Sequence, residues 1–242
     1  MLIICPECGR GVSEYATGCP NCGLPMSMFD RARKTRASYD TTAVDLGLPS
    51  GTLWASANVG AKSPYDIGMY FSWGDSTIKE SFTWENYKYF LGYIKQDEYY
   101  TYPRLSKYVC HKRLGTIDNK SYVEQSDDPA SIIMGYDWKT PSYEQQEELL
   151  RHCRIEKTTI KGVNGYTVIG HNGNSIFLIN TGYIDGKTTK VNQYPHFWLN
   201  QANPYGYENA TIFRIVETFN GISFGTCAHN RNEGFVIRAV KK

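Results

Sequence analysis

Four cysteines near the N-terminus constrain this chain more than any other feature. Cys5 and Cys8 form one Cys-x2-Cys pair, Cys19 and Cys22 form a second, and ten residues separate the pairs. Four thiolates with this spacing are typical of a closed tetrahedral Zn²⁺ site. A unit this small buries too little apolar surface to fold alone, so metal binding must supply its stability. We therefore expect a zinc ribbon over residues 1–23, with one structural Zn²⁺ per chain held by these four cysteines.

Two alternatives compete with zinc for these cysteines: a pair of redox-active motifs, or a disulfide framework. The metal is favoured because proline and glycine occupy matching places in the two motifs. Gly9 and Gly23 follow the second cysteine of each pair, where the chain must turn sharply. The unit resembles the short zinc ribbons at the ends of many bacterial proteins, and that resemblance implies contacts with protein or nucleic acid.

The remainder of the chain, about 200 residues, is long enough to bury a substantial core. The formal net charge is only +2, which indicates neither nucleic acid nor a membrane as the main partner. No apolar run approaches the length that spans a bilayer, and the N-terminal residues lack a signal-peptide pattern. We therefore expect a cytoplasmic protein in which Cys110, Cys153 and Cys227 are free thiols.

Residues 24–42 lack apolar periodicity and are interpreted as a basic linker, either a tether or a short basic helix. Its cations are Arg31, Arg33, Lys34 and Arg36. A phosphate-contacting patch is one interpretation, and it would support weak, salt-sensitive nucleic-acid binding. A solvated linker is favoured, because acidic residues dilute the charge and no aromatic side chains alternate with the cations.

From residue 43 to residue 242 the pattern predicts an α+β domain with two helices and short, mainly antiparallel strands. Strands are expected at 43–46 and 52–58, joined as a hairpin by a turn that contains proline and glycine. Residues 75–127 are polar, tyrosine-rich and weakly patterned, so a long loop-dominated excursion is expected. Further strands are expected near residues 196–199, 211–217, 222–226 and 235–240.

Local signals place both helices. Asp128 can cap a short helix that has proline at its first position and ends at Gly135. Ser142 and Gln145 form a capping-box pattern, which predicts a second helix over residues 143–152.

An Asn-Gly dipeptide marks a hairpin later in the chain. Asn172 and Gly173 lie between the expected strands 166–169 and 175–179. This dipeptide favours a type I′ turn, because both central residues of that turn have positive φ.

Four stretches of the body together resemble the Fibrobacter succinogenes major paralogous domain family. They are, in order, residues 44–55, 138–142, 173–178 and 234–240. The resemblance covers about residues 43–240, and residues 91–127 match poorly. It implies a C-type-lectin-like fold related to the formylglycine-generating enzyme domain, in which a rigid frame displays ligand-binding residues near the C-terminus.

An enzymatic role is tested by the residues that such relatives need. Formylglycine-generating relatives bind copper through two nearby cysteines late in the domain, whereas Cys227 is the only cysteine in that region. Sulfoxide-synthase relatives need a His-x3-His-x-Glu site, which this sequence lacks. The Gly-x-Ser-x-Gly pattern occurs at residues 221–225, but it falls within the expected strand 222–226 and not at the strand-to-helix turn that a nucleophile elbow needs. No phosphate-binding glycine loop is present, so no catalytic residue is named.

Two polar segments near the C-terminus, residues 200–209 and 229–233, are instead typical of a recognition surface. Tyrosine offers a large contact area at low entropic cost, and asparagine offers adaptable hydrogen bonds. Trp198, just before the first segment, is expected in the core rather than in contact with ligand. The candidate ligand-binding residues are Asn200, Gln201, Asn203, Tyr205, Tyr207, Asn209, Asn230 and Arg231.

The sequence thus favours a non-enzymatic binding protein for a protein or glycan ligand, with the ribbon as an accessory interaction module. A formylglycine-generating-enzyme-like oxidoreductase, or a degenerate relative of one, is the first alternative. Nucleic-acid binding through the ribbon and the basic linker is the second.

Overall fold

The computed structural model describes residues 2–5, 10–30, 38–95, 101–190, 194–203, 206–219 and 221–242. Within these ranges the chain forms short strands paired antiparallel and two α-helices, α2 (Pro129–Met134) and α3 (Tyr143–His152). The expected α+β class is therefore confirmed.

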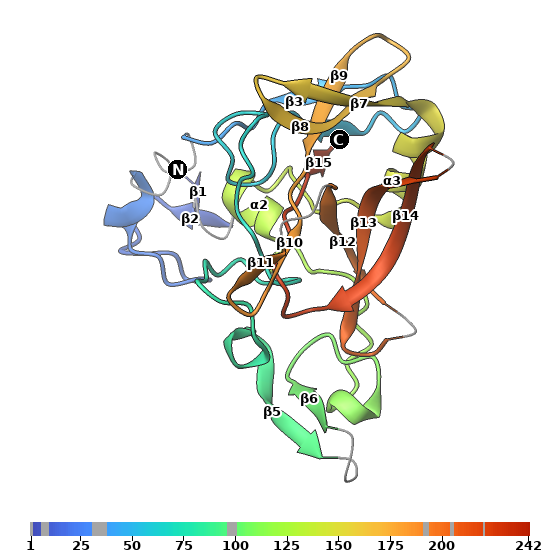
Figure 1. Cartoon of the computed structure of the whole chain (residues 1–242). Helices are drawn as coiled ribbons and strands as arrows, with labels where there is room; N and C mark the ends of the chain where they lie inside the picture. Colours follow the sequence, from blue (N-terminus) through green and yellow to red (C-terminus); the bar gives the residue numbers. More distant parts are fainter. Residues whose placement is uncertain are drawn as a thin grey trace.

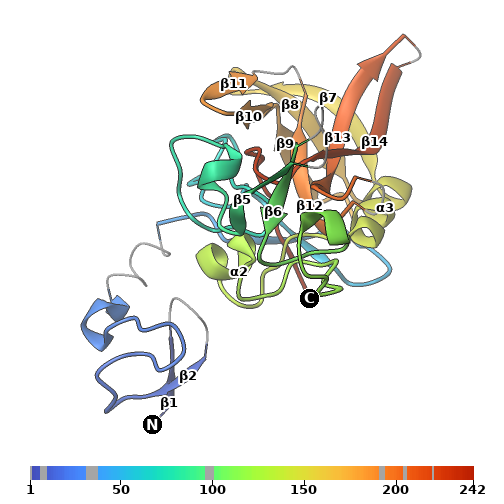
Figure 2. The same ribbon diagram turned by 90° about the horizontal axis from the view of Figure 1, so that it is seen from below.

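The N-terminal unit is a small hairpin with its own core. Strands β1 (Leu2–Ile4) and β2 (Gly11–Ser13) pair antiparallel, and a 3-10 turn, η1 (Met26–Met28), follows. Cys5, Cys19, Val12 and Phe29 are buried together. Figures 1 and 2 show this unit as a lobe apart from the body.

Three three-stranded sheets form the frame of the body (Figure 1). The first has the order β15-β4-β3, and the others are β7-β8-β9 and β12-β13-β14. Two-stranded ribbons, β5-β6 and β10-β11, complete the framework. The bounds are β3 Ala43–Asp45, β4 Leu53–Ala55, β5 Phe90–Lys95, β6 Thr101–Leu105, β7 Arg154–Ile160, β8 Val163–Ile169, β9 Ser175–Ile179, β10 Tyr183–Asp185, β11 Thr188–Lys190, β12 His196–Ala202, β13 Asn209–Thr218, β14 Gly221–Asn230 and β15 Val240–Lys241.

The segment 231–240 is buried at every position and joins the two hydrophobic cores of the body. Phe235, Ile237 and Ala239 pack in one core, whereas Val236 and Val240 pack in the other. Successive side chains of an extended chain point to opposite sides, which explains the division. The expected continuous strand at 235–240 is wrong, because the segment pairs briefly with several partners and only its end belongs to a named strand.

Both helices begin as the sequence predicts. The Asp128 carboxylate accepts a hydrogen bond from the Ala130 amide at 2.9 Å, and α2 ends before Gly135. At α3 the Ser142 hydroxyl accepts from the Gln145 amide, and the Gln145 side chain accepts from the Ser142 amide at 3.0 Å. These are local interactions, so local sequence predicts them.

The β3–β4 and β8–β9 hairpins are also confirmed, but the expected type I′ turn is wrong. Gly173 has a φ of +83°, whereas Asn172 does not have positive φ. The Asn172 side chain instead donates to the Asp45 carbonyl at 2.9 Å and accepts from the Asn174 amide. A contact 127 residues away in sequence therefore sets this loop.

Two features of the fold were not expected. Strand β7 directly follows α3 and pairs with β8 along its whole length. The excursion 75–127 contains the β5–β6 ribbon, and Tyr87, Tyr89 and Tyr108 anchor it by packing in the core. These three tyrosines are therefore structural, whereas Tyr93 and Tyr122 are exposed. Trp198, also expected in the core, is 1% exposed.

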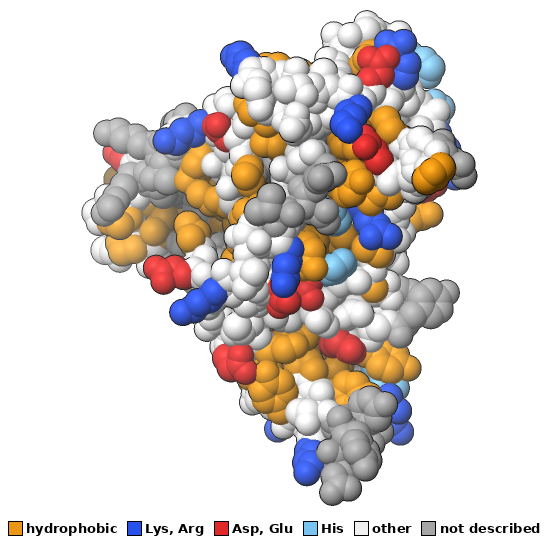
Figure 3. Space-filling view, viewed as in Figure 1, with side chains coloured by type: hydrophobic (Ala, Val, Ile, Leu, Met, Phe, Trp, Pro, Cys, Tyr) orange, Lys and Arg blue, Asp and Glu red, His pale blue; other side chains and the backbone are white. Residues whose placement is uncertain are grey.

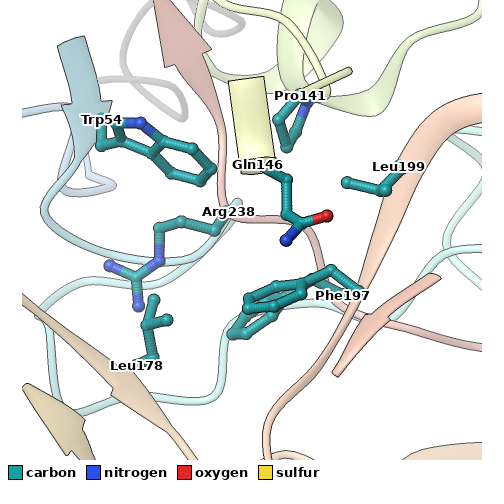
Figure 4. A pocket seen from close by; sticks show the side chains of 8 residues that line it. Trp54, Pro141, Gln146, Leu178, Phe197, Leu199 and Arg238 are labelled. Carbon is teal, nitrogen blue, oxygen red and sulfur yellow. The ribbon is translucent and has the colours of Figure 1, made fainter. Parts of the chain in front are cut away.

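A small cavity lies beneath α3, beside Arg238 and Trp54 (Figure 4). Its volume is about 10 Å³. Gln146 points into it from α3 with a fully buried side chain. The Gln146 side-chain oxygen and nitrogen have no hydrogen-bond partner in the described part of the chain, and neither does the Trp54 indole nitrogen. Burying polar atoms without partners costs free energy, so Gln146 is a weak point of the core.

We expect Gln146→Met to raise the free energy of unfolding by about 1 kcal/mol, because it removes two unpaired polar atoms from an apolar site. Gln145→Met, one residue earlier on the same helix, is the matched control. It breaks the capping box and should lower the free energy of unfolding by about 1 kcal/mol. Urea unfolding measures both variants, and a loss of stability in Gln146→Met would contradict the assignment.

Candidate functional site

Three of the four expected metal ligands lie together in the N-terminal unit. The sulfur atoms of Cys5, Cys19 and Cys22 all lie within 4.8 Å of one another, and Cys5 Sγ is 3.6 Å from Cys22 Sγ. Cys5 and Cys19 are buried, whereas Cys22 is exposed. Cys8 lies outside the described residues.

The geometry of these sulfurs suits a metal ion. Sulfurs at tetrahedral corners around an ion with metal–sulfur bonds of about 2.3 Å lie about 3.8 Å apart, close to the observed separation. A disulfide requires about 2.05 Å, so the Cys5–Cys22 distance excludes one here. The Cys19 carbonyl accepts from the Gly23 amide at 2.8 Å, and Gly23 has a φ of +78°. The three cysteines could therefore hold a metal ion.

The two polar segments of the expected recognition surface meet at one end of the β12-β13-β14 sheet. Asn209 and Asn230 are direct partners in the β13–β14 register. Asn200 and Gln201 lie at the end of β12, where Tyr122 forms a bridge with Gln201. Segments about 20 residues apart in sequence thus form one polar edge, which we call the loop face. Tyr205 lies outside the described residues.

Hydrogen bonds hold the loop face firmly. The Asn203 side chain accepts from the Gly206 amide at 3.0 Å, and the Asn203 amide donates to the Asn209 carbonyl at 3.0 Å. The Tyr207 ring stacks on His111, with centroids 3.8 Å apart and planes 9° from parallel. Asn200, Gln201, Asn203, Tyr207, Asn209 and Asn230 are all half-buried. Asn203 and Tyr207 are therefore held in place before a ligand arrives, whereas the buried Oδ1 atoms of Asn200 and Asn209 have no hydrogen-bond partner within the described ranges.

The prediction that Arg231 binds ligand is wrong, because its side chain is fully buried. Its guanidinium donates to the carbonyls of Tyr108, Tyr207 and Asn209 at 2.7, 3.0 and 3.1 Å. It also lies over the Trp73 ring, 5.0 Å from the centroid. A side chain with no exposed surface cannot contact a ligand, so Arg231 ties the excursion 75–127 to the loop face.

A third group of polar side chains lies beside the loop face and was not predicted. His229 Nδ1 is 2.7 Å from Glu233 Oε2, and Cys227 lies near enough to His229 to raise the pKa of its imidazole. Cys227 and His229 are two residues apart on β14, so they share one side of the strand. That Cys-x-His spacing, with a glutamate four residues later, was a usable signal in the sequence.

The histidines of this region differ in charge. Burial lowers the pKa of His229, but hydrogen bonds to Cys227 and Glu233 and their negative charges raise it more, to about 9. Burial lowers the pKa of His196 to about 4 against the opposing hydrogen bond to the Tyr194 carbonyl. At neutral pH His229 is therefore an imidazolium and His196 is uncharged.

The described residues give less support to the other two expected functions, the oxidoreductase and the nucleic-acid-binding protein. Cys110 contacts the Tyr207 carbonyl and Arg231, and Cys153 packs in the second core. Among the described residues, neither cysteine contacts Cys227 as a copper pair would require. The basic residues at 31–36 lie outside the described residues. Cations and anions are interspersed on the face in Figure 3. In the described ranges no helix is long and apolar enough to cross a membrane.

Comparison with protein families, with curated proteins and with solved structures found no match to this chain. Functional assignment therefore depends on the residues themselves.

We expect Arg231→Met to lower the free energy of unfolding by about 3 kcal/mol or more, because three buried carbonyls lose their donor. Arg104→Met is the matched control, since Arg104 is an exposed arginine on β6, and it should change stability by less than about 0.5 kcal/mol. Thermal and urea unfolding measure both variants. Equal stability of the two variants would remove the structural role assigned to Arg231.

Proposed function

We propose that this protein is a non-enzymatic binding protein whose body recognises a protein or glycan ligand through the loop face. The observation that carries the proposal is the meeting of two asparagine-containing segments, the first of which also holds tyrosine, at one end of a firmly paired sheet. Preset side chains lose little conformational entropy on binding, which favours affinity. The antiparallel strands and two helices are compatible with the C-type-lectin-like fold that the sequence resembles.

For the N-terminal unit we propose a zinc ribbon, with Cys8 as the fourth ligand beside Cys5, Cys19 and Cys22. Four thiolates favour Zn²⁺ and leave no open coordination position, so the ion stabilises the fold and performs no chemistry. Its hairpin buries only a handful of apolar residues, which supports a stability that depends on metal. The ribbon then supplies an accessory contact surface in the cytoplasm.

Freshly purified full-length protein should contain about one zinc ion per chain, measured by elemental analysis. Cys19→Ser should abolish zinc retention, because three ligands hold the ion far less tightly than four. Cys153→Ser, a substitution of a half-buried cysteine in the body, is the control and should retain the metal. Wild-type protein purified without any metal would refute the ribbon.

Ligand binding should depend on the loop face. Tyr207→Ala should weaken binding to glycans on an array, or to a protein partner isolated by crosslinking, by about tenfold or more. The backbone carbonyl that receives Arg231 remains in this variant, so thermal unfolding should change little. Tyr143→Ala removes an exposed tyrosine from α3 and is the matched control. Equal binding by the two variants would move the ligand site elsewhere.

A further inference from the structure

The group Cys227, His229 and Glu233 has the connectivity of an activated thiol. Cys227 and His229 lie on the same side of β14 and interact electrostatically, and His229 Nδ1 lies 2.7 Å from a Glu233 carboxylate oxygen. A thiol next to an imidazolium loses its proton more readily than a free thiol. A carboxylate on the other side of the ring orients the imidazole and stabilises its positive charge.

Glu233 is held in place for this role. Its second carboxylate oxygen accepts a hydrogen bond from the Asn230 side chain at 3.1 Å. Its backbone amide donates to the Asn230 carbonyl at 3.0 Å, which closes the turn after β14. The Glu233 side chain is 11% exposed and that of His229 is 23% exposed. The ion pair is thus largely shielded from solvent, which strengthens it.

Aromatic rings fix the position of the imidazole. His229 meets the edge or face of Tyr183 and Phe235, with centroids 5.1 and 4.9 Å away. Tyr183 and Phe235 stack on each other at 5.1 Å. The ring of His229 therefore cannot swing away from Cys227 without disturbing this packing.

Other charged groups also face this site. Asp185 and Tyr183, on β10, interact electrostatically with the same region, and burial raises the pKa of Tyr183. His196 on β12 lies near His229 and is uncharged at neutral pH, and Arg214 on β13 pairs in register with His196.

A metal site does not explain the group. Among the described residues, the only set of three or more cysteine, histidine or acidic ligand atoms that come within 4.8 Å of one another is Cys5, Cys19 and Cys22. Cys227, His229 and Glu233 instead form a chain, in which the histidine stands between the other two. Such a chain is suited to proton transfer rather than to joint coordination.

The other two cysteines of the body provide an internal comparison. Cys110, Cys153 and Cys227 are all half-buried free thiols. Burial and the charge of Glu148 raise the pKa of Cys153 to about 11. The Cys110 sulfur lies 3.8 Å from both the Tyr207 carbonyl and an Arg231 nitrogen. Of these three cysteines, only Cys227 lies beside a histidine that is itself bonded to a carboxylate, within the described ranges.

We propose that Cys227 is a nucleophilic thiol that forms a covalent bond with an electrophilic carbon atom carrying a leaving group. The thiol proton passes to solvent, the His229 imidazolium stabilises the sulfur as it attacks, and Glu233 is a positioning residue that holds the imidazolium. The bond between Sγ and the carbon forms, the bond from that carbon to the leaving group breaks, and the leaving group departs with its electron pair. The product is an S-alkyl or S-acyl cysteine, formed once per chain, and the proposal stands independently of ligand binding by the loop face.

Alkylation by iodoacetamide tests the proposal on the wild-type, zinc-containing chain, with each cysteine followed separately by peptide mass spectrometry. Here the Sγ–carbon bond forms and iodide leaves. We expect Cys227 to react at least about tenfold faster than Cys153 at neutral pH. The ratio of the two rates should grow as the pH falls from about 9 to about 6.5, because His229 gains charge while Cys153 stays protonated.

Variants separate the roles of the two partners. His229→Gln should slow alkylation of Cys227 by about tenfold or more and abolish the growth of the ratio at low pH. Glu233→Gln should cause a smaller loss, because the imidazole remains but its charge is less stable. His152→Gln is the matched control: it removes a half-buried histidine next to Cys153 and should leave the Cys227 rate unchanged.

Two outcomes would overturn the proposal. One is wild-type Cys227 that reacts no faster than Cys153, a result that needs no variant and so cannot be blamed on misfolding. The other is folded His229→Gln protein, judged by thermal unfolding, that alkylates at the wild-type rate.

Discussion

The alternation of side chains along residues 231–240 is the constraint on which the rest of the body depends. One extended strand-like segment supplies Phe235 and Ile237 to one core and Val236 and Val240 to the other. Because the period is two, a shift by one residue would exchange the two sets and unpack both cores at once. The backbone of the segment is fixed by bonds to Phe71, Trp198 and Lys139, which belong to distant parts of the chain.

The same segment also explains where the loop face and the group of Cys227, His229 and Glu233 lie. Arg231 begins it and ties together the excursion 75–127 and the loop face. Glu233 follows two residues later and meets His229 on β14. Residues that carry the candidate chemistry are therefore attached directly to the most deeply buried backbone in the body, which gives them little freedom to move.

Sequence reasoning succeeded where the interaction was local. The cap at Asp128, the capping box at Ser142 and the knuckle spacing of Cys19 and Cys22 each involve residues within a few positions of one another. It failed where a distant partner decided the outcome. Asn172 abandons the expected turn for a bond to Asp45, and Arg231 looked like a loop residue although three distant carbonyls bury it. Strand periodicity alone would place Cys227 and His229 on one side of β14, but the partner Glu233 lies beyond the strand and depends on the turn that follows it.

The deep placement of residues 231–240 also shapes how the chain acquires its structure. Neither core can close until the ribosome has passed residue 240, because each lacks side chains from that segment until then. Contacts such as Phe71 with Phe235 span more than 160 residues, and closing such long loops is slow. The N-terminal unit draws its core from residues within the first 30, so it can mature early in translation. The distribution of contacts therefore predicts folding in two stages, in which the N-terminal unit can form before the body.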